Sequence, residues 1–129
     1  MFEKLEVFRI AAAMAQHAGQ KQAVVAQNVA NADTPGYRAR DLPAFQTIFQ
    51  SPTHMNQPRA TRARHLNSAQ QVPGVIAVFE EKNPASPNGN QVSLEAEILK
   101  SVSAKRQHDR ALAIYKSALG ILRTSMRSN

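Results

Sequence analysis

A chain of 129 residues with only 5% aromatic residues, and with alanine supplying much of its 43% apolar content, can form one domain but only a thin hydrophobic core. Its formal net charge of +7 would attract nucleic acid, an anionic membrane or an acidic partner. The absence of cysteine excludes a disulfide framework and a thiolate zinc site. We therefore expect helices that rely on other chains to bury their apolar surface.

The first part of the chain has the periodicity of a helix that packs against another helix. Small and apolar residues recur at alternating intervals of three and four positions through residues 5–29. This spacing predicts a helix over residues 2–32, roughly 45 Å long at 1.5 Å per residue. The residues expected on its packing face include Leu5, Phe8, Ala12, Ala15 and Val29.

The same segment bears on cellular location. Residues 10–15 form its longest apolar run, which is too short to span a membrane. The opening residues Met-Phe-Glu-Lys-Leu-Glu lack the basic start of a secretory signal. We expect a chain that stays in the cytosol or is exported by a route without a cleaved signal peptide.

A compact stop signal follows the first helix. Pro35 lacks the amide hydrogen that a helix needs, so helical structure should end by about Asp33. Pro35 and Gly36 suit the two central positions of a type II turn. The amides of Asn28 and Asn31 emerge on one face of the last helical turn, where they can satisfy free backbone groups. This helix-stop motif comprises Asn28, Asn31, Thr34, Pro35, Gly36 and Tyr37, and the alternative is an ordinary helix end followed by a loop.

Residues 37–90 differ in character and hold six of the seven prolines. The β-branched run at residues 75–79 follows a Pro-Gly pair and predicts a short strand or half of a hairpin. Residues 50–71 are polar and basic, as is typical of a loop, and residues 84–90 read as a linker. The chain thus divides into residues 1–36 with the first helix and its stop motif, a loop-rich middle at residues 37–90, and a C-terminal segment at residues 91–129.

The C-terminal segment restores the helical period and predicts a helix over residues 93–127, roughly 50 Å long. Ser93 is a suitable N-cap, and Glu95 and Glu97 place negative charge in the first turn. The residues expected on its packing face are Leu112, Tyr115, Leu119, Leu122 and Met126.

These elements predict a mainly α fold: an antiparallel, coiled-coil-like pair of long N- and C-terminal helices with a loose, partly β middle segment. An isolated helix pair of this kind is marginally stable and leaves apolar side chains on its outer faces, which favours packing between subunits. The side chains expected on those outer faces are Val7, Met14, Val25, Ile114, Ala118 and Ile121.

The sequence offers little for catalysis. It contains no nucleotide-binding glycine loop, no pair of histidines at metal-ligand spacing and no nucleophile elbow. His17 and His108 fall within the two helices, whereas His54 and His65 lie in the middle segment without clustered carboxylates. We therefore assign no catalytic, cofactor-binding or metal-binding residues, and predict that the protein is not an enzyme.

The helix-stop motif also carries a family resemblance. The string Asn-Val-Ala-Asn-Ala-Asp-Thr-Pro-Gly-Tyr at residues 28–37, continued by Arg-Ala-Arg-Asp, resembles the N-terminal signature of flagellar rod and hook proteins. The string Gly-Asn-Gln-Val-Ser-Leu-Glu at residues 89–95 resembles the start of their C-terminal helix. The resemblance covers about residues 1–45 and 89–127. The short length favours the proximal rod members, because hook and distal-rod relatives carry large inserted domains.

This resemblance implies a structural subunit of the bacterial flagellar basal-body rod, needed for motility, with no cofactor and no small-molecule substrate. It implies export through the flagellar type III apparatus and assembly across the periplasm into a helical tube. The implied partners are copies of the chain, other rod subunits, and basal-body ring or adaptor proteins.

A basic nucleic-acid-binding module is the alternative. The net charge and the basic patch formed by Arg59, Arg62 and Arg64 favour it. The acidic residues interleaved with the other cations, the lack of a recognisable reading helix and the few aromatic residues argue against it.

Overall fold

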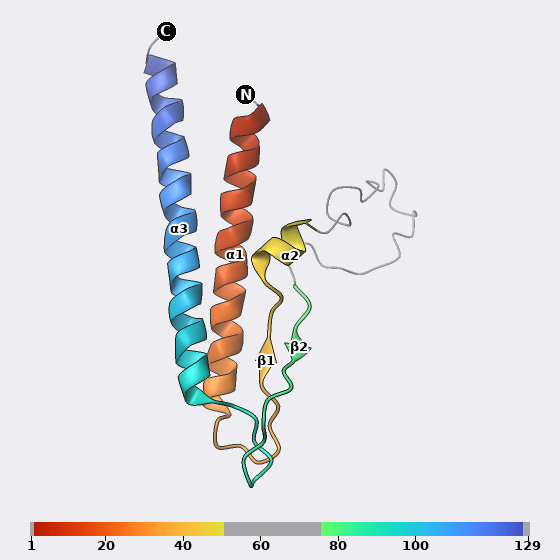
Figure 1. Cartoon of the computed structure of the whole chain (residues 1–129). Coiled ribbons are helices and arrows are strands. Elements are labelled where there is room, and N and C mark those ends of the chain that lie inside the picture. The colour runs from red at the N-terminus through yellow and green to blue at the C-terminus, as the bar shows by residue number, and fades with distance from the viewer. Residues whose placement is uncertain (1, 51–75, 128–129) are drawn as a thin grey trace, which may run out of the picture.

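Two long helices dominate the computed structural model, which describes residues 2–50 and 76–127. Helix α1 (Phe2–Ala30) and helix α3 (Leu94–Arg127) lie side by side and run in opposite directions (Figure 1). The two termini therefore lie at the same end of the pair, and α3 extends past the start of α1. The predicted antiparallel pair of long helices is confirmed.

The helix ends follow the local sequence closely. Helix α1 ends at Ala30, and the residues before Pro35 form turns, so the helix stops two residues earlier than expected. Before α3, the Ser93 hydroxyl accepts a hydrogen bond from the Ala96 amide at 3.4 Å, as an N-cap does. The sequence thus places both inner ends of the helix pair to within about two residues.

The seam between the helices is narrow and lined by small residues. Ala11, Ala18 and Val25 of α1 are buried at intervals of seven, and Ala104 and Ala111 of α3 follow the same interval. A seven-residue repeat keeps one face of each helix turned toward its partner along the whole pair. Because alanine is short, the two backbones can approach closely while little apolar area is buried.

The larger apolar residues expected on the packing faces border this seam instead of filling it. Five of the predicted residues are exposed: Ala12, Val29, Leu112, Tyr115 and Met126. Four others are partly buried: Phe8, Ala15, Leu119 and Leu122. The side chain of Leu5 lies outside the described part of the chain. Of the expected packing residues, Phe8 and Tyr115 meet across the pair, whereas the fully buried positions are neighbouring ones, mostly alanines, that allow a closer approach.

The predicted outer faces are partly correct. Val7, Ile114 and Ile121 are exposed, whereas Val25 is buried at 4% exposure within the seam. Met14 and Ala118 are partly buried. Val25 was misplaced because it occupies the same heptad position as Ala11 and Ala18.

The middle segment contributes an arm that packs along α1 (Figure 1). The arm consists of strand β1 (Arg40–Asp41), helix α2 (Phe45–Gln50) and strand β2 (Phe79–Glu80). The strands are antiparallel, with Arg40 opposite Glu80 and Asp41 opposite Phe79. The predicted strand at residues 75–79 overlaps β2 only at Phe79, since residues 76–78 are extended without strand pairing and residue 75 lies outside the described chain.

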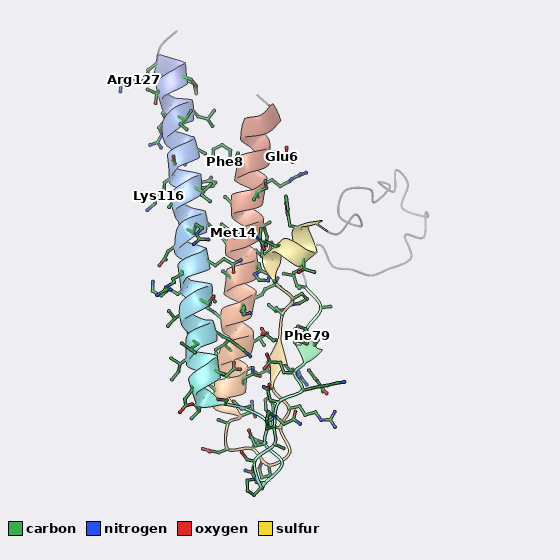
Figure 2. All side chains as sticks on the ribbon, in the orientation of Figure 1. Glu6, Phe8, Met14, Phe79, Lys116 and Arg127 are labelled. Atoms are coloured by element: carbon green, nitrogen blue, oxygen red, sulfur yellow. The ribbon has the colours of Figure 1, made fainter. Side chains whose placement is uncertain are left out.

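Figure 2 shows how side chains are arranged in the half of the helix pair nearer the termini. Phe8 lies between the helices, and its ring meets the ring of Tyr115 edge to face at 5.1 Å between centroids. Lys116 and Arg127 point away from α1 along the far half of α3. None of the helices in the described residues combines the length and hydropathy that a membrane span needs.

Candidate functional site: a polar base joining the helices

Asn28 is the centre of a buried polar cluster at the end of the pair opposite the termini. We call this cluster, which also includes Asn90, Glu97 and Lys100, the polar base. Its side chain has no exposed surface. Its amide nitrogen donates to the Arg40 carbonyl at 2.7 Å and to the Glu97 carboxylate at 3.0 Å. Its amide oxygen accepts from the Arg40 backbone amide at 3.0 Å and from the Tyr37 hydroxyl at 3.4 Å. One side chain thus joins α1, the arm and α3.

Glu97 is the charged counterpart of Asn28. It is 1% exposed, and its second carboxylate oxygen contacts the Lys100 ammonium at 2.9 Å. Lys100 also contacts Glu81 of the arm at 2.7 Å and Asp41 at 3.6 Å. A buried charge is tolerated only when it is paired and hydrogen-bonded, and this network meets both conditions.

The network shifts the acid–base properties of two of its members. Burial opposes the charged form of Lys100, but hydrogen bonds to Glu81 and Glu97 and the charge of Asp41 outweigh it and raise the pKa of Lys100 above 10.5. Burial would likewise raise the pKa of Asp41. The hydrogen bond from the Leu42 amide and the charges of Lys21 and Lys100 prevail, so the pKa of Asp41 falls below 3.8. Both groups are therefore held in their charged forms.

Asn90 closes the end of α1 from the other side. It is 2% exposed, and its amide nitrogen donates to the carbonyls of Asn31 and Thr34 at 3.0 and 2.7 Å. Its amide oxygen accepts from the Val92 amide at 2.8 Å. Both carbonyls belong to the turn that follows α1, so Asn90 ties this turn to the segment that leads into α3.

The turn after α1 has the geometry expected for its proline and glycine. The Tyr37 amide donates to the Thr34 carbonyl at 3.3 Å, and Gly36 has a φ of 71°. A positive φ at the second central position is the mark of a type II turn, so this prediction is confirmed. Gly89 has a φ of 79°, and a side chain there would face the Gly36 backbone at 3.4 Å. The loop after α1 and the loop before α3 therefore approach each other closely at these two glycines.

Two other motif residues stabilise the stop locally. The Asn31 side chain donates to the Gln27 carbonyl at 2.8 Å, and the Thr34 hydroxyl donates to the Asn31 side-chain oxygen at 3.2 Å. Both lie nearer the surface than Asn28, and Pro35 is exposed. The structure thus gathers the six motif residues at one end of the pair, but only Asn28 is fully buried.

His17 holds the arm against both helices farther along the pair. It is 2% exposed; its Nε2 lies 2.8 Å from the Pro43 carbonyl and its Nδ1 lies 3.1 Å from the Gln107 amide nitrogen. Because a carbonyl only accepts, Nε2 carries the hydrogen and Nδ1 accepts from Gln107. The ring also meets Phe45 of α2 edge to face. His17 therefore has a structural role.

Sequence reasoning found one half of the polar base and missed the other. Asn28 and Tyr37 belong to the recognised motif, whereas Asn90, Glu97 and Lys100 were not singled out as members of the same cluster. The string at residues 89–95 was the available signal. Within the described residues, no group of three or more His, Asp or Glu is arranged to hold a metal ion. His54, His65 and the basic patch at residues 59–64 lie outside those residues.

Comparison with known proteins supplies the family. The model of the family described as flagella basal body rod protein matches residues 9–38, which span most of α1 and the whole stop motif. A flagellar basal body rod protein FlgB from Agrobacterium fabrum is 31% identical over 121 residues, covering 89% of this chain and 88% of the relative. The chain belongs to the flagellar basal body rod protein family.

Other relatives match a smaller part of the chain. The FlgB proteins of Yersinia enterocolitica and Escherichia coli K12 are 34% and 29% identical over 88 and 101 residues. These alignments cover 60% and 73% of this chain. Rod proteins are structural components of the flagellar basal body, and the structure of this member is consistent with that role.

Proposed function

We propose that this chain is a structural subunit of the proximal rod that assembles with copies of itself and with other rod subunits into a helical tube. The observation that carries the proposal is the distribution of apolar side chains. The buried seam is mostly alanine, whereas large apolar side chains are exposed along both helices. These exposed side chains can bury their apolar area only against other chains.

The polar base gives the subunit a defined shape for assembly. Asn28, Glu97 and Asn90 fix how α1, the arm and α3 meet. Contacts between different surfaces of identical subunits do not close into a ring unless the rotation allows it, and so generate helical assemblies. A rigid base with exposed apolar helices suits such an assembly.

The further partners that we propose follow from the rod role: basal-body ring or adaptor proteins and the flagellar type III export apparatus. A rod subunit works in the part of the basal body that crosses the periplasm. A weakly stabilised helix pair suits export, because little free energy is needed to unfold it for threading.

Complementation tests the proposal. The chain should restore swimming and assembled rods to a strain that lacks its own copy, as scored on soft agar and by electron microscopy of basal bodies. The double variant Pro35→Ala/Gly36→Ala should be expressed but should build no rods, because α1 would continue through the turn. Gly19→Ala, a helical position with open space around it, is the matched control and should swim normally. Normal rods in the double variant would contradict the role of the stop motif.

A further inference from the structure

A row of side chains that we call the lateral stripe runs along α3 beside the alanine seam. Its members are separated by alternating intervals of four and three residues: Ile98, Val102, Lys105, Asp109, Leu112, Lys116, Leu119, Arg123 and Met126. This interval keeps side chains on one face of a helix, as in a coiled-coil seam. Leu112 follows the buried Ala111 by one position, which is about 100° around the helix. The lateral stripe therefore lies on a flank of the pair and not in its seam.

The lateral stripe lies on the side of α3 that the arm does not use. Lys100 contacts Glu81 of the arm, and Gln107 contacts His17, which anchors the arm. Both α3 residues precede a seam alanine by four positions, so they lie on the other flank of the seam. The apolar members of the lateral stripe are correspondingly accessible: Ile98, Val102, Leu112 and Met126 are exposed.

The charge of the lateral stripe is balanced in its middle and unbalanced toward the end of α3. Lys105 and Asp109 pair with each other at 3.1 Å. Lys116 and Arg123 are exposed, and among the described residues neither is within ion-pair distance of an acid. Figure 2 shows Lys116 pointing away from α1. The last part of the stripe thus alternates apolar side chains with two uncompensated positive charges.

An acidic helix has the chemistry that matches this surface. Apolar side chains at intervals of four and three pack against a helix of the same period, whereas a lipid surface or a nucleic acid requires no such interval. Lys116 and Arg123 are seven residues apart, so two acids at the same spacing on the partner complement both. Complementary charges along a helix contact favour the matching partner over others.

The long helices of this chain do not supply such an acidic surface. Their sequences contain the following acidic residues, no two of which are seven positions apart: Glu3, Glu6, Glu95, Glu97 and Asp109. The lateral stripe itself has one acid, Asp109, which already pairs with Lys105. A second copy packed on the stripe through either long helix would therefore leave Lys116, Arg123 or both without an acid.

We propose that the lateral stripe binds an acidic helix of a different protein, with two acids seven residues apart opposite Lys116 and Arg123. The inference rests on the proposed rod function, in which other chains surround α3, and it assigns this flank to a neighbour other than a copy of this chain. The contact leaves the alanine seam and the polar base unchanged, because no member of the stripe is buried in either.

Three synthetic helical peptides test the charge requirement on the full-length chain. Each peptide carries leucine at intervals of four and three, and they differ only at two positions seven apart, which hold glutamate, glutamine or lysine. Fluorescence anisotropy should give the glutamate peptide a Kd roughly tenfold below that of the glutamine peptide, because two charge pairs form. The double variant Lys116→Glu/Arg123→Glu should reverse the order, so that the lysine peptide binds most tightly.

Matched controls separate the lateral stripe from net charge. Arg106→Glu/Arg110→Glu makes the same change in charge at two exposed positions of α3 outside the stripe, and should bind the glutamate peptide as the unsubstituted chain does. Physiological salt screens the longer-range effect of that change. Phosphatidylglycerol vesicles and a DNA duplex serve as other anionic probes, and circular dichroism verifies the helix content of every variant.

Several outcomes would overturn the inference: no binding of the glutamate peptide, equal affinity for the three peptides, or an unchanged order in Lys116→Glu/Arg123→Glu. Tighter binding of vesicles or DNA that this variant loses would assign the stripe to a lipid or a nucleic acid instead. Loss of self-association in the same variant, measured by sedimentation velocity, would make a second copy the occupant.

The rod function is judged separately by complementation. A chain that builds rods in cells but gives any of these results loses only the acidic partner. A chain that builds no rods loses the proposed function, even if the glutamate peptide binds.

Discussion

The two halves of the helix pair are held together in different ways. At the polar base, Asn28, Glu97 and Asn90 are buried and connect α1, the arm and α3 through directional hydrogen bonds. Along the rest of the pair, the two helices meet at the alanine seam, and large apolar side chains such as Leu99 and Met126 are exposed. The polar base therefore specifies the geometry of the subunit, whereas the seam buries little apolar surface.

The physical reason lies in how each kind of contact encodes position. A buried amide or carboxylate is satisfied in one arrangement only, and leaving it unpaired costs about 1–3 kcal/mol or more. Alanine against alanine is nearly the same at every heptad, so the seam by itself specifies alignment weakly. This comparison predicts large effects of substitution at the base and size-dependent effects in the seam.

Asn28→Ala should have the largest effect. It leaves one oxygen of the buried Glu97 carboxylate and both backbone groups of Arg40 without their hydrogen-bond partner, so we expect a loss of about 3 kcal/mol. Urea unfolding followed by circular dichroism measures it. Asn31→Ala is the matched control, because that amide bonds only within its own helix end and should cost less than about 1 kcal/mol. Equal losses in the two variants would remove the special role of Asn28.

Neighbouring alanines test the position of the seam. Ala11 is 1% exposed and Ala12 is exposed. Ala11→Leu should force the helices apart and cost about 2 kcal/mol, as overpacking of a close contact does. Ala12→Leu should change stability by less than about 0.5 kcal/mol. The same unfolding assay distinguishes them, and a larger loss at Ala12 would restore the stripe first expected from the sequence.

The glycines of the base and of the helices should respond in opposite directions. Gly36→Ala and Gly89→Ala each place a side chain at a positive φ and should cost about 1–2 kcal/mol. Gly120→Ala, within α3 and with open space around it, should stabilise the chain by about 0.5–1 kcal/mol. Thermal unfolding midpoints provide the comparison. A rise in midpoint for Gly36→Ala would show that the turn does not hold the left-handed conformation.

Acidic pH should destabilise the polar base of the helix pair by less than the substitutions above. The pKa of Asp41 is lowered in the folded chain, so its stabilising contribution is present above 3.8 and is lost as pH falls through the folded pKa. The advantage of the unsubstituted chain over Asp41→Asn should therefore shrink below 3.8. Urea midpoints of both chains across pH give the difference directly. A difference that stays constant through this range would mean that the Asp41 charge contributes nothing.

Alkaline pH should also destabilise the polar base of the helix pair. The pKa of Lys100 is raised, so its contribution is complete below 10.5 and is lost as pH rises through the folded pKa. Lys105, at 70% side-chain exposure and paired in the described part of the chain with Asp109 alone, is the comparison residue. Lys100→Met should remove the steep loss of folding stability in alkali, whereas Lys105→Met should leave that loss unchanged.

The sequence by itself determined the features that depend on near neighbours. Pro35 and Gly36 set the turn, Ser93 capped α3, and the apolar period required two long helices. Each of these follows from the conformational preferences of a residue and those within four positions of it.

Tertiary structure alone decided the phase of the seam and the partners of the buried polar groups. Alanine is compatible with both the buried and the exposed side of a helix, so only the approach of α3 decided that Ala11 and not Ala12 is buried. Glu97 and Asn28 are sixty-nine residues apart, and nothing local marks them as a pair. Burial of a carboxylate depends on partners brought from distant segments, and those partners exist only once the chain has folded.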